Sequence, residues 1–397
     1  MQIHPVHRSL CTDCGVSKTA EPKRCAHACQ FIQPNYPVLE KKTHGRTRTE
    51  GVEAHNAADQ LLFGPHENML QAKLREPVAG AQWTGITTRL AEKLLENGWV
   101  DAVIATAPDP DDVWKPMPVI VTQAADMANC RGMRMGFGPL ISLVEPALAR
   151  GLKRLAVIGI PCQIYALRAL QDQLQATHGL ERLYVIGTPC SDNTTTDNFH
   201  TFLKLLSDQP SDINYLEFRA DYQVEIRTRQ GGKRLIPFLN LPISQLPSDF
   251  FPLTCKTCVD YTNVLSDVTV GYMGGSGEQW LLVRNATGQA MLALLGDALV
   301  TQAPASGGNR AGAVTGFMKN VQRAAGGLPL RRMPNWLRPI VNWLMPRIGP
   351  RGVEFARARV EMKAIETVLH LQREAPAKMK NMVPDHVWKI VSRYNIH

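Results

Sequence analysis

The chain has 397 residues, of which 44% are hydrophobic and 20% are charged, a composition typical of a globular protein with a sizeable core. These values exclude collagen-like, mucin-like and intrinsically disordered chains. No run of about 18 to 20 apolar residues marks a membrane-spanning helix. The first residues also lack the apolar stretch of a secretory signal, so we expect a cytoplasmic protein.

The positive charge is concentrated toward the C-terminal end. The formal net charge is +9, and the residues from Arg310 onward include 16 basic and 5 acidic side chains. A segment of this kind attracts nucleic acid, an anionic membrane or an acidic protein, unless it is simply a solvated face.

From about residue 80 the pattern alternates between strands and helices. Apolar runs predict strands at 100–107, 117–123, 154–160 and 182–188. The segments between them predict helices at 90–98, 138–151, 164–175 and about 194–207. Strands that alternate with helices pair in parallel in an α/β sheet.

The pattern changes after residue 210. Residues 215–241 alternate with period two around the Gly231-Gly232 turn, which predicts antiparallel hairpins. Further along we expect strands at 267–275 and 279–285, a short helix at 291–299, a loop over 301–330 and an amphipathic helix at about 351–374.

The nine cysteines are spaced for metal or redox chemistry rather than for disulfides. Four near the N-terminus form a C-x2-C-x10-C-x3-C set: Cys11, Cys14, Cys25 and Cys29. Taken alone, this set suits a zinc site as well as an iron–sulfur cluster. Cys130 has no companion and is expected to be structural.

Cys162 and Cys190 each follow a predicted strand through the same strand–x-Pro-Cys–helix sequence. They should lie at the carboxyl ends of parallel strands, where open α/β sheets bind ligands. If the two strands are neighbours, they lie about 4.8 Å apart, and two thiolates there could share one centre, with Cys255 and Cys258 completing an S₄ set. The alternatives are two buried structural thiols and a redox dithiol at 255–258.

Nucleotide-binding fingerprints are absent from the sequence. No G-x-G-x-x-G motif follows a predicted strand, and we find no P-loop, no H-E-x-x-H and no G-x-S-x-G.

Three long stretches resemble one known family, the beta subunits of deazaflavin-reducing hydrogenases and dehydrogenases. They are GAQWTGITTRLAEKLLENGWVDAVI (80–104), AVIGIPCQIYALRAL (156–170) and CKTCVDYTNVLSDVTVGYMGG (255–275). Within the family, the chain is similar to the pigment-reductase branch. Members of that branch reduce the 8-vinyl group of divinyl chlorophyllide or protochlorophyllide with electrons from ferredoxin, or reduce 7-hydroxymethyl chlorophyll a. The segments that favour the 8-vinyl reductases are 24–37, 107–119, 130–140, 187–200 and 217–225.

The resemblance implies FAD and two 4Fe–4S clusters. Eight thiols are the implied cluster ligands: Cys11, Cys14, Cys25, Cys29, Cys162, Cys190, Cys255 and Cys258. In the hydroxymethyl reductase the third N-terminal cysteine closely follows the second, where this chain has Val16-Ser17. Either Cys25 or a non-cysteine ligand therefore completes that cluster, and how the cysteines divide between the clusters stays open.

The resemblance also implies a flavin site in the turn at 80–88 and in the region after Cys258. The implied flavin-binding residues are Gln82, Trp83, Thr84, Gly85, Thr87, Asn193, Asn263 and Met273. The candidates for a proton donor are Asp192, Tyr261 and Tyr272. Ordinary turn chemistry or core packing is the alternative for most of these residues.

The expected fold is α/β, with a mixed sheet core built of parallel βαβ units and an antiparallel hairpin region. Four regions are expected: an N-terminal iron–sulfur segment at 1–45, an α/β flavin-binding region at 46–150, an α/β domain with cluster cysteines at 151–300 and a basic helical tail at 301–397.

Reduced ferredoxin is the expected electron donor, and it would dock on the basic tail because ferredoxins are acidic. Residues 335–350 interleave Trp and Arg. This stretch would touch the thylakoid surface, cover the pigment or form a homo-oligomer interface, unless it packs in the core.

Two other functions fit the sequence. One is reduction of 7-hydroxymethyl chlorophyll a with the same cofactors. The other is a non-enzymatic zinc and nucleic-acid-binding protein, which would be colourless where clusters and flavin give a brown protein. Cysteines at strand ends are not a zinc-finger arrangement, so we expect no nucleic-acid partner.

Overall fold

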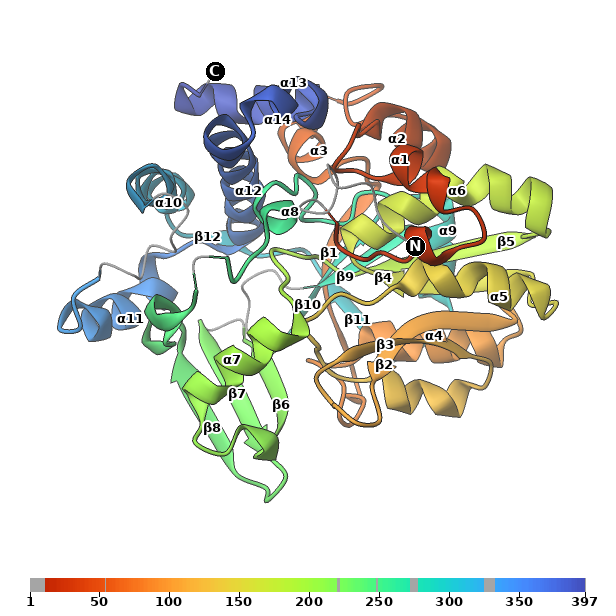
Figure 1. Ribbon diagram of the computed structural model, residues 1–397, viewed down its shortest axis with the longest axis horizontal. Helices are drawn as coiled ribbons and strands as arrows, with labels where there is room; N and C mark the ends of the chain where they lie inside the picture. The colour runs from red at the N-terminus through yellow and green to blue at the C-terminus, as the bar shows by residue number, and fades with distance from the viewer. Residues whose placement is uncertain are drawn as a thin grey trace.

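The computed structural model of the protein describes residues 11–53, 55–219, 222–247, 249–271, 278–324 and 333–396. Its centre is an eight-stranded sheet in the order β11-β1-β10-β9-β5-β4-β2-β3 (Figure 1). The strands are β1 (Asn68–Leu74), β2 (Ala102–Pro108), β3 (Pro116–Val121), β4 (Arg154–Gly159), β5 (Arg182–Gly187), β9 (Val268–Gly271), β10 (Gln279–Val283) and β11 (Leu299–Gln302).

The predicted mixed sheet is confirmed. Strand β2 pairs in parallel with β4, β4 with β5, and β5 with β9. Antiparallel strands extend the sheet on both sides, with β3 next to β2 and with β10, β1 and β11 beyond β9. No sequence pattern indicated β1, because its polar and apolar residues do not form the continuous apolar run of a buried strand.

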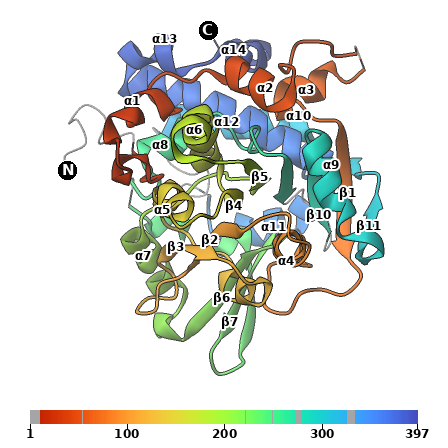
Figure 2. The ribbon, with the colours of Figure 1, turned by 90° about the vertical axis from the view of Figure 1, so that its right-hand side faces the viewer.

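Helices cover both faces of the large sheet. Helices α5 (Val144–Ala149) and α6 (Pro161–His178) lie on one face, and α4 (Ile86–Glu96) and α9 (Ala286–Ala293) lie on the other (Figure 2). Because successive strand residues point to opposite faces, Ile104 packs in the core beneath α6 whereas Val103 packs in the core beneath α4.

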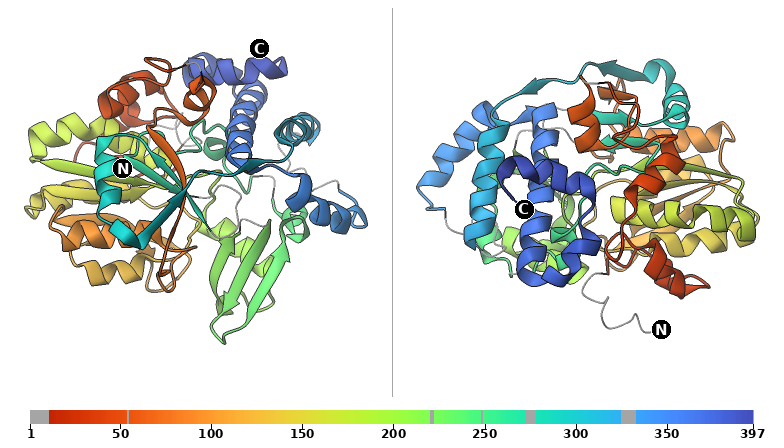
Figure 3. Two further views of the ribbon diagram at one scale, coloured as in Figure 1. Left: turned by 180° about the vertical axis from the view of Figure 1, so that it is seen from behind. Right: turned by 90° about the horizontal axis from the view of Figure 1, so that it is seen from above.

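The predicted hairpins form a separate three-stranded sheet of β6 (Ile213–Phe218), β7 (Gln223–Thr228) and β8 (Lys233–Pro237). Helix α7 (Thr196–Leu206) packs on it, and Phe199 and Leu203 of α7 share a hydrophobic core with Leu216 and Val224 of the sheet. This sheet projects from the large sheet in the front view and from behind (Figures 1 and 3).

The C-terminal region is helical, as predicted. It contains α10 (Arg310–Ala324), α11 (Leu337–Ile348), α12 (Val353–Glu374), α13 (Met379–Met382) and α14 (Asp385–Val391), and the short strands β12 (Ser306–Gly307) and β13 (Arg351–Gly352). Seen from above, these blue helices gather on one side of the molecule (Figure 3). The described residues contain no helix long and apolar enough to cross a membrane.

The loop predicted over 301–330 is wrong for residues 310–324, which form α10, and residues 325–330 lie outside the described part of the chain. Helix α10 packs against α12 and buries Val314 and Val321, so tertiary contacts override the low helix propensity of its glycines. Helix α12 is itself part of the core, because Ile365 and Val368 are fully buried in a cluster that includes Trp280 of β10.

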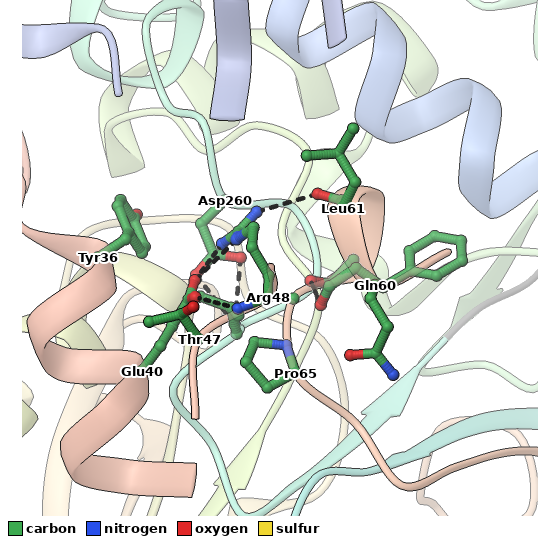
Figure 4. A network of polar contacts seen from close by, with 12 residues as sticks. Tyr36, Glu40, Thr47, Arg48, Gln60, Leu61, Pro65 and Asp260 are labelled. Carbon is green, nitrogen blue, oxygen red and sulfur yellow. Dashed lines mark hydrogen bonds and ion pairs between the residues drawn. The ribbon is translucent and has the colours of Figure 1, made fainter. Parts of the chain in front are cut away.

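A buried ion pair orders the N-terminal region. It contains α1 (Cys25–Ala28), α2 (Tyr36–His44) and α3 (Ala57–Phe63). Glu40 of α2 accepts hydrogen bonds from the backbone nitrogen of Arg48 at 3.0 Å and from its Nε at 2.8 Å, and Arg48 also donates to the Leu61 carbonyl (Figure 4). Two buried charges that satisfy each other in this way fix the path of the chain between α2 and α3.

Asp267 joins three elements beneath the sheet edge. One carboxylate oxygen accepts hydrogen bonds from Nη2 of Arg168 and Nδ2 of Asn285, both at 2.9 Å, and the other accepts from the backbone nitrogen of Val185 at 2.7 Å. The side chains of Arg168 and Asp267 are each 5% exposed, so loss of one partner leaves the other charge buried without compensation.

We predict that Asp267→Ala lowers the free energy of unfolding by about 3 to 5 kcal/mol, because Arg168 stays buried and unpaired. The matched control is Asp172→Ala on the same helix as Arg168, whose carboxylate is 76% exposed and pairs with Lys42, and we expect it to cost less than about 1 kcal/mol. Urea unfolding followed by circular dichroism measures both values. Equal losses of unfolding free energy in the two variants would contradict the structural role given to the buried Arg168–Asp267 pair.

Candidate functional site

The carboxyl ends of β4 and β5 bring two of the predicted ligands to one edge of the sheet. Gly159 and Gly187, the last residues of the two strands, lie opposite each other in the parallel register. Cys162 sits in the first turn of α6, and the backbone nitrogen of Cys190 donates to the Tyr261 carbonyl at 3.0 Å. The prediction that these cysteines follow neighbouring parallel strands is confirmed.

A small cavity lies at this edge and is lined by four thiols. These are Cys162, Cys190, Cys255 and Cys258. Cys255 belongs to the short helix α8 (Leu253–Lys256), and the backbone nitrogen of Cys258 bonds the carbonyl of Cys255 at 3.3 Å. Residues nearly a hundred positions apart thus supply thiols to a single cavity, as the proposed S₄ set requires.

Burial controls the protonation of these thiols. It raises the pKa of Cys255 to about 12 and that of Cys258 to about 11, and it raises the pKa of Cys162 and Cys190 well above the ordinary value. The thiols therefore hold their protons at neutral pH until a bound cation displaces them.

The N-terminal cysteines form a second group beside the first. Burial, together with the smaller effects of the charges of Cys25, Cys29 and Cys11, raises the pKa of Cys14 to about 12, so these four thiols lie within electrostatic range of one another. The charge of Cys14 also raises the pKa of Cys162, a thiol of the first group. The two groups of four thiols are therefore neighbours, which is the arrangement that electron transfer between two centres needs.

In the described part of the chain, no three His, Cys, Asp or Glu side chains come close enough to hold one metal ion. A 4Fe–4S cluster binds each of its thiolates through a different iron, whereas a tetrahedral zinc holds all its ligands on one ion.

Hydrogen bonds to sulfur accompany both groups. The backbone nitrogen of Asn193 lies 3.4 Å from Sγ of Cys255, Nε2 of Gln30 lies 3.7 Å from Sγ of Cys258, and the nitrogen of Asp13 lies 3.4 Å from Sγ of Cys11. Donors of this kind stabilise a thiolate and tune the potential of a bound cluster.

Lys363 of α12 reaches the thiol cavity from the C-terminal region, and the sequence pattern did not predict it. Its ammonium group donates to the Cys255 carbonyl at 2.6 Å, to Glu366 at 2.7 Å and to Asp192 at 3.0 Å. The carboxylates of Asp192 and Glu366 raise its pKa against the effect of burial, so it stays charged. No local motif marks this lysine, since only the fold brings α12 to the cysteines.

The predicted turn at 80–88 is a turn only up to Gly85, because α4 begins at Ile86 and includes Thr87. It lies at the same edge of the sheet but on the opposite face. The Thr84 hydroxyl donates to Oε1 of Gln279 at 2.9 Å and accepts a hydrogen bond from the backbone nitrogen of Leu74. The hydroxyl therefore has a structural role within the fold. Trp83 has a φ of 59° and Gly85 a φ of 83°. Gln82 and Thr87 are half-buried.

Two asparagines fasten the loops around the thiol cavity. Asn193 bonds both the nitrogen and the carbonyl of Gly136, at 2.9 and 2.8 Å. Asn263 donates from Nδ2 to the Gly159 carbonyl at 2.7 Å, while its buried Oδ1 has no partner among the described residues. A buried acceptor without a partner is uncommon in folded proteins.

The three candidate proton donors have different outcomes. Asp192 lines the thiol cavity and is paired with Lys363. Tyr261 is buried in the core cluster that Cys162 and Cys258 contact. Tyr272 and the predicted flavin contact Met273 lie outside the described residues.

The sequence matches a known family over both halves of the large sheet. Residues 69–145 match the N-terminal part, and residues 152–305 the C-terminal part, of the family described as coenzyme F420 hydrogenase/dehydrogenase, beta subunit. The chain belongs to this family.

Curated relatives cover nearly the whole chain. An uncharacterized protein of a Nostoc species is 37% identical over 98% of this chain and 94% of its own length. The chloroplastic 7-hydroxymethyl chlorophyll a reductase of rice is 34% identical over 99% of this chain and 84% of its own length. One component of the F420H2 dehydrogenase of Methanosarcina mazei is 23% identical over 74% of this chain and 84% of its own length.

A solved structure shares the fold. A chain of the F420-reducing NiFe hydrogenase complex from Methanosarcina barkeri superposes with a TM-score of 0.56 at 20% identity, covering 77% of this chain and 92% of that one. The relatives whose names state an activity are oxidoreductases or components of them, which agrees with a redox site at the thiol cavity.

We predict that Lys363→Met lowers the midpoint of thermal unfolding, because it leaves Glu366 and Asp192 without their buried cation. The double variant Lys363→Met/Glu366→Gln should regain part of the loss, since one of the unpaired charges is then neutral. The control is Lys389→Met, a lysine of α14 for which the structure shows no ion pair among the described residues. A double variant no more stable than Lys363→Met would contradict this account.

Proposed function

We propose that the protein is a ferredoxin-dependent oxidoreductase that reduces the 8-vinyl group of divinyl chlorophyllide or protochlorophyllide to an ethyl group. The observation that carries the proposal is the four-thiol cavity at the carboxyl edge of the parallel strands, in a chain 34% identical to a chlorophyll-modifying reductase. The choice of the vinyl group rests on the long segments that resemble the 8-vinyl reductases, among them 130–140 and 187–200.

The proposed cofactors are two 4Fe–4S clusters and FAD. Clusters accept single electrons and a flavin holds two, which matches a one-electron donor to a two-electron reduction. Cys162, Cys190, Cys255 and Cys258 would hold one cluster, and the N-terminal group would hold the other. Lys363 would offset the negative charge of the first thiolate set, because its ammonium group bonds the Cys255 carbonyl.

The flavin would lie between the turn at 80–88 and the thiol cavity. Both border the carboxyl edge of the parallel strands, where such sheets bind their ligands. Asn193 and Asn263 hold the loops of this edge in place, and the unpaired Oδ1 of Asn263 offers an acceptor to a ligand. The proposed source of a proton is the hydrogen-bonded pair formed by Asp192, which lines the cavity, and the Lys363 ammonium group.

Reduction of 7-hydroxymethyl chlorophyll a is the second candidate. It is favoured by the 34% identity to the rice reductase over 99% of this chain. Both reactions need the same electron path, so the difference lies in how the pigment is held. A non-enzymatic zinc protein is the remaining alternative, and its lack of colour would distinguish it from a brown protein with clusters and flavin.

The C-terminal region is the proposed surface for ferredoxin and for a membrane. Ion pairs within the protein neutralise part of its positive charge. Examples are Arg357 with Asp59 and Arg393 with Glu361. On α11, Trp343 is 59% exposed with the Arg347 guanidinium 4.2 Å above its ring. An exposed aromatic beside a cation suits the headgroup region of an anionic bilayer.

We predict that Cys255→Ser lowers the iron bound per chain by about half, because one of two equal clusters loses a ligand. The control is Cys130→Ser, a cysteine that lies in a different part of the core and should leave the iron content unchanged. Iron and acid-labile sulfide, measured on anaerobically purified protein, give the answer. Full iron content in Cys255→Ser would contradict the proposal that Cys255 is a cluster ligand.

We predict that the purified protein, given reduced ferredoxin without oxygen, converts divinyl chlorophyllide to its 8-ethyl product. In a parallel reaction, 7-hydroxymethyl chlorophyll a should stay unchanged. Chromatography of the extracted pigments measures both outcomes. Conversion of the hydroxymethyl pigment alone would establish the second candidate instead.

A further inference from the structure

A second pocket, lined by arginines, lies near the thiol cavity. It is an open cleft of about 420 Å³, within the size range of small-molecule sites. It forms where the hairpin sheet meets the end of β2, between Pro108 and Trp114 on one side and Tyr215 on the other. We call it the arginine pocket, after Arg131, Arg134 and Arg229 in its lining.

The arginine pocket carries positive charge that the described residues do not neutralise. Arg134 donates to the carbonyls of Val113 and Gly132, at 3.2 and 3.4 Å, and has no carboxylate partner in the described part of the chain. Burial lowers its pKa, the mark of a cation that lacks an anion.

Arg131 is only partly compensated. Its Nη2 shares the carboxylate of Glu92 with Arg89, and its Nε is buried without a hydrogen-bond acceptor among the described residues. Two arginines on one carboxylate leave a net positive charge, and an open donor on a guanidinium favours an incoming anion.

The remaining walls of the arginine pocket are apolar and aromatic. Val113, Trp114, Met133 and Leu216 contribute to them. Trp114 is fixed by a hydrogen bond from its indole nitrogen to the Ile213 carbonyl at 3.1 Å. A pocket with a flat apolar wall and guanidinium groups at one side suits a planar hydrophobic ligand that ends in an acid group.

One chain segment joins the arginine pocket to the redox site. Arg131 and Arg134 line the arginine pocket, whereas Phe137, three residues further on, lines the thiol cavity. Gly136 between them is held by Asn193, whose backbone nitrogen bonds Sγ of Cys255. Gly80, at the start of the proposed flavin turn, also borders the arginine pocket.

We propose that the arginine pocket binds the free carboxylate of the pigment substrate, with Arg134 and Arg131 as the anchoring cations. This inference rests on the proposed function and deepens it, because it makes the substrate a pigment acid rather than a pigment ester. A carboxylate accepts two parallel hydrogen bonds from a guanidinium, which an ester cannot match.

The test is a binding titration of the anaerobic holoprotein with divinyl chlorophyllide and with its methyl ester, followed by pigment fluorescence without any reductant. Arg134→Gln should raise the Kd for the acid about tenfold, the effect of one charge-assisted hydrogen bond, and leave the Kd for the ester unchanged. Arg134→Lys keeps the charge, so its Kd for the acid should lie between those of the wild-type protein and Arg134→Gln. The matched control is Arg150→Gln, which changes an exposed arginine after α5. We expect it to bind both pigments with the Kd values of the wild-type protein.

Two outcomes would overturn the assignment. Equal weakening of acid and ester binding in Arg134→Gln would mean that the arginine recognises no carboxylate. Loss of bound flavin, measured after acid release, would assign the arginine pocket to the flavin phosphates instead. Because binding is measured without turnover, a protein that binds the acid through Arg134 but fails to reduce it would refute the proposed reaction and leave this site standing.

Discussion

The parallel register of β4 and β5 is the constraint on which the rest of the site depends. Because Gly159 and Gly187 end their strands side by side, the chain leaves the sheet twice at one edge, and each exit carries a Pro-Cys pair. Asn263 then ties the two exits together through the carbonyls of Gly159 and Thr188. A shift of one residue in this register would turn the following side chains away from each other.

Buried charges hold distant parts of the chain to that edge. Asp267 connects α6 to β5, Arg48 and Glu40 connect the segments around α2, and Lys363 connects α12 to the loop of Cys255. Each pair is costly to bury and more costly to break, which favours a single arrangement of the loops around the thiols. The loops can then position their ligands without belonging to regular secondary structure.

The proximity of the two pockets gives the protein a division of labour. Under the proposed function the thiol cavity would hold the electron carriers, and the more open arginine pocket would take the larger substrate. The segment from Arg131 to Phe137 borders both. A substrate anchored by its acid end would therefore be held at a fixed distance from the redox centre, which is the positioning that reduction of one group among several requires.

The sequence by itself determined the α/β class, the parallel strands and the placement of Cys162 and Cys190, because these follow from local periodicity and from a short strand–Pro-Cys–helix motif. It also indicated the hairpins and α12. Only the tertiary structure decided that α10 is a helix, that α12 lies in the core and that Lys363 reaches the thiols. The same holds for the arginine pocket, whose lining comes from β2, β6 and the segment near Arg131. These features depend on contacts between residues far apart in the chain, and such contacts leave no periodic signal in the sequence.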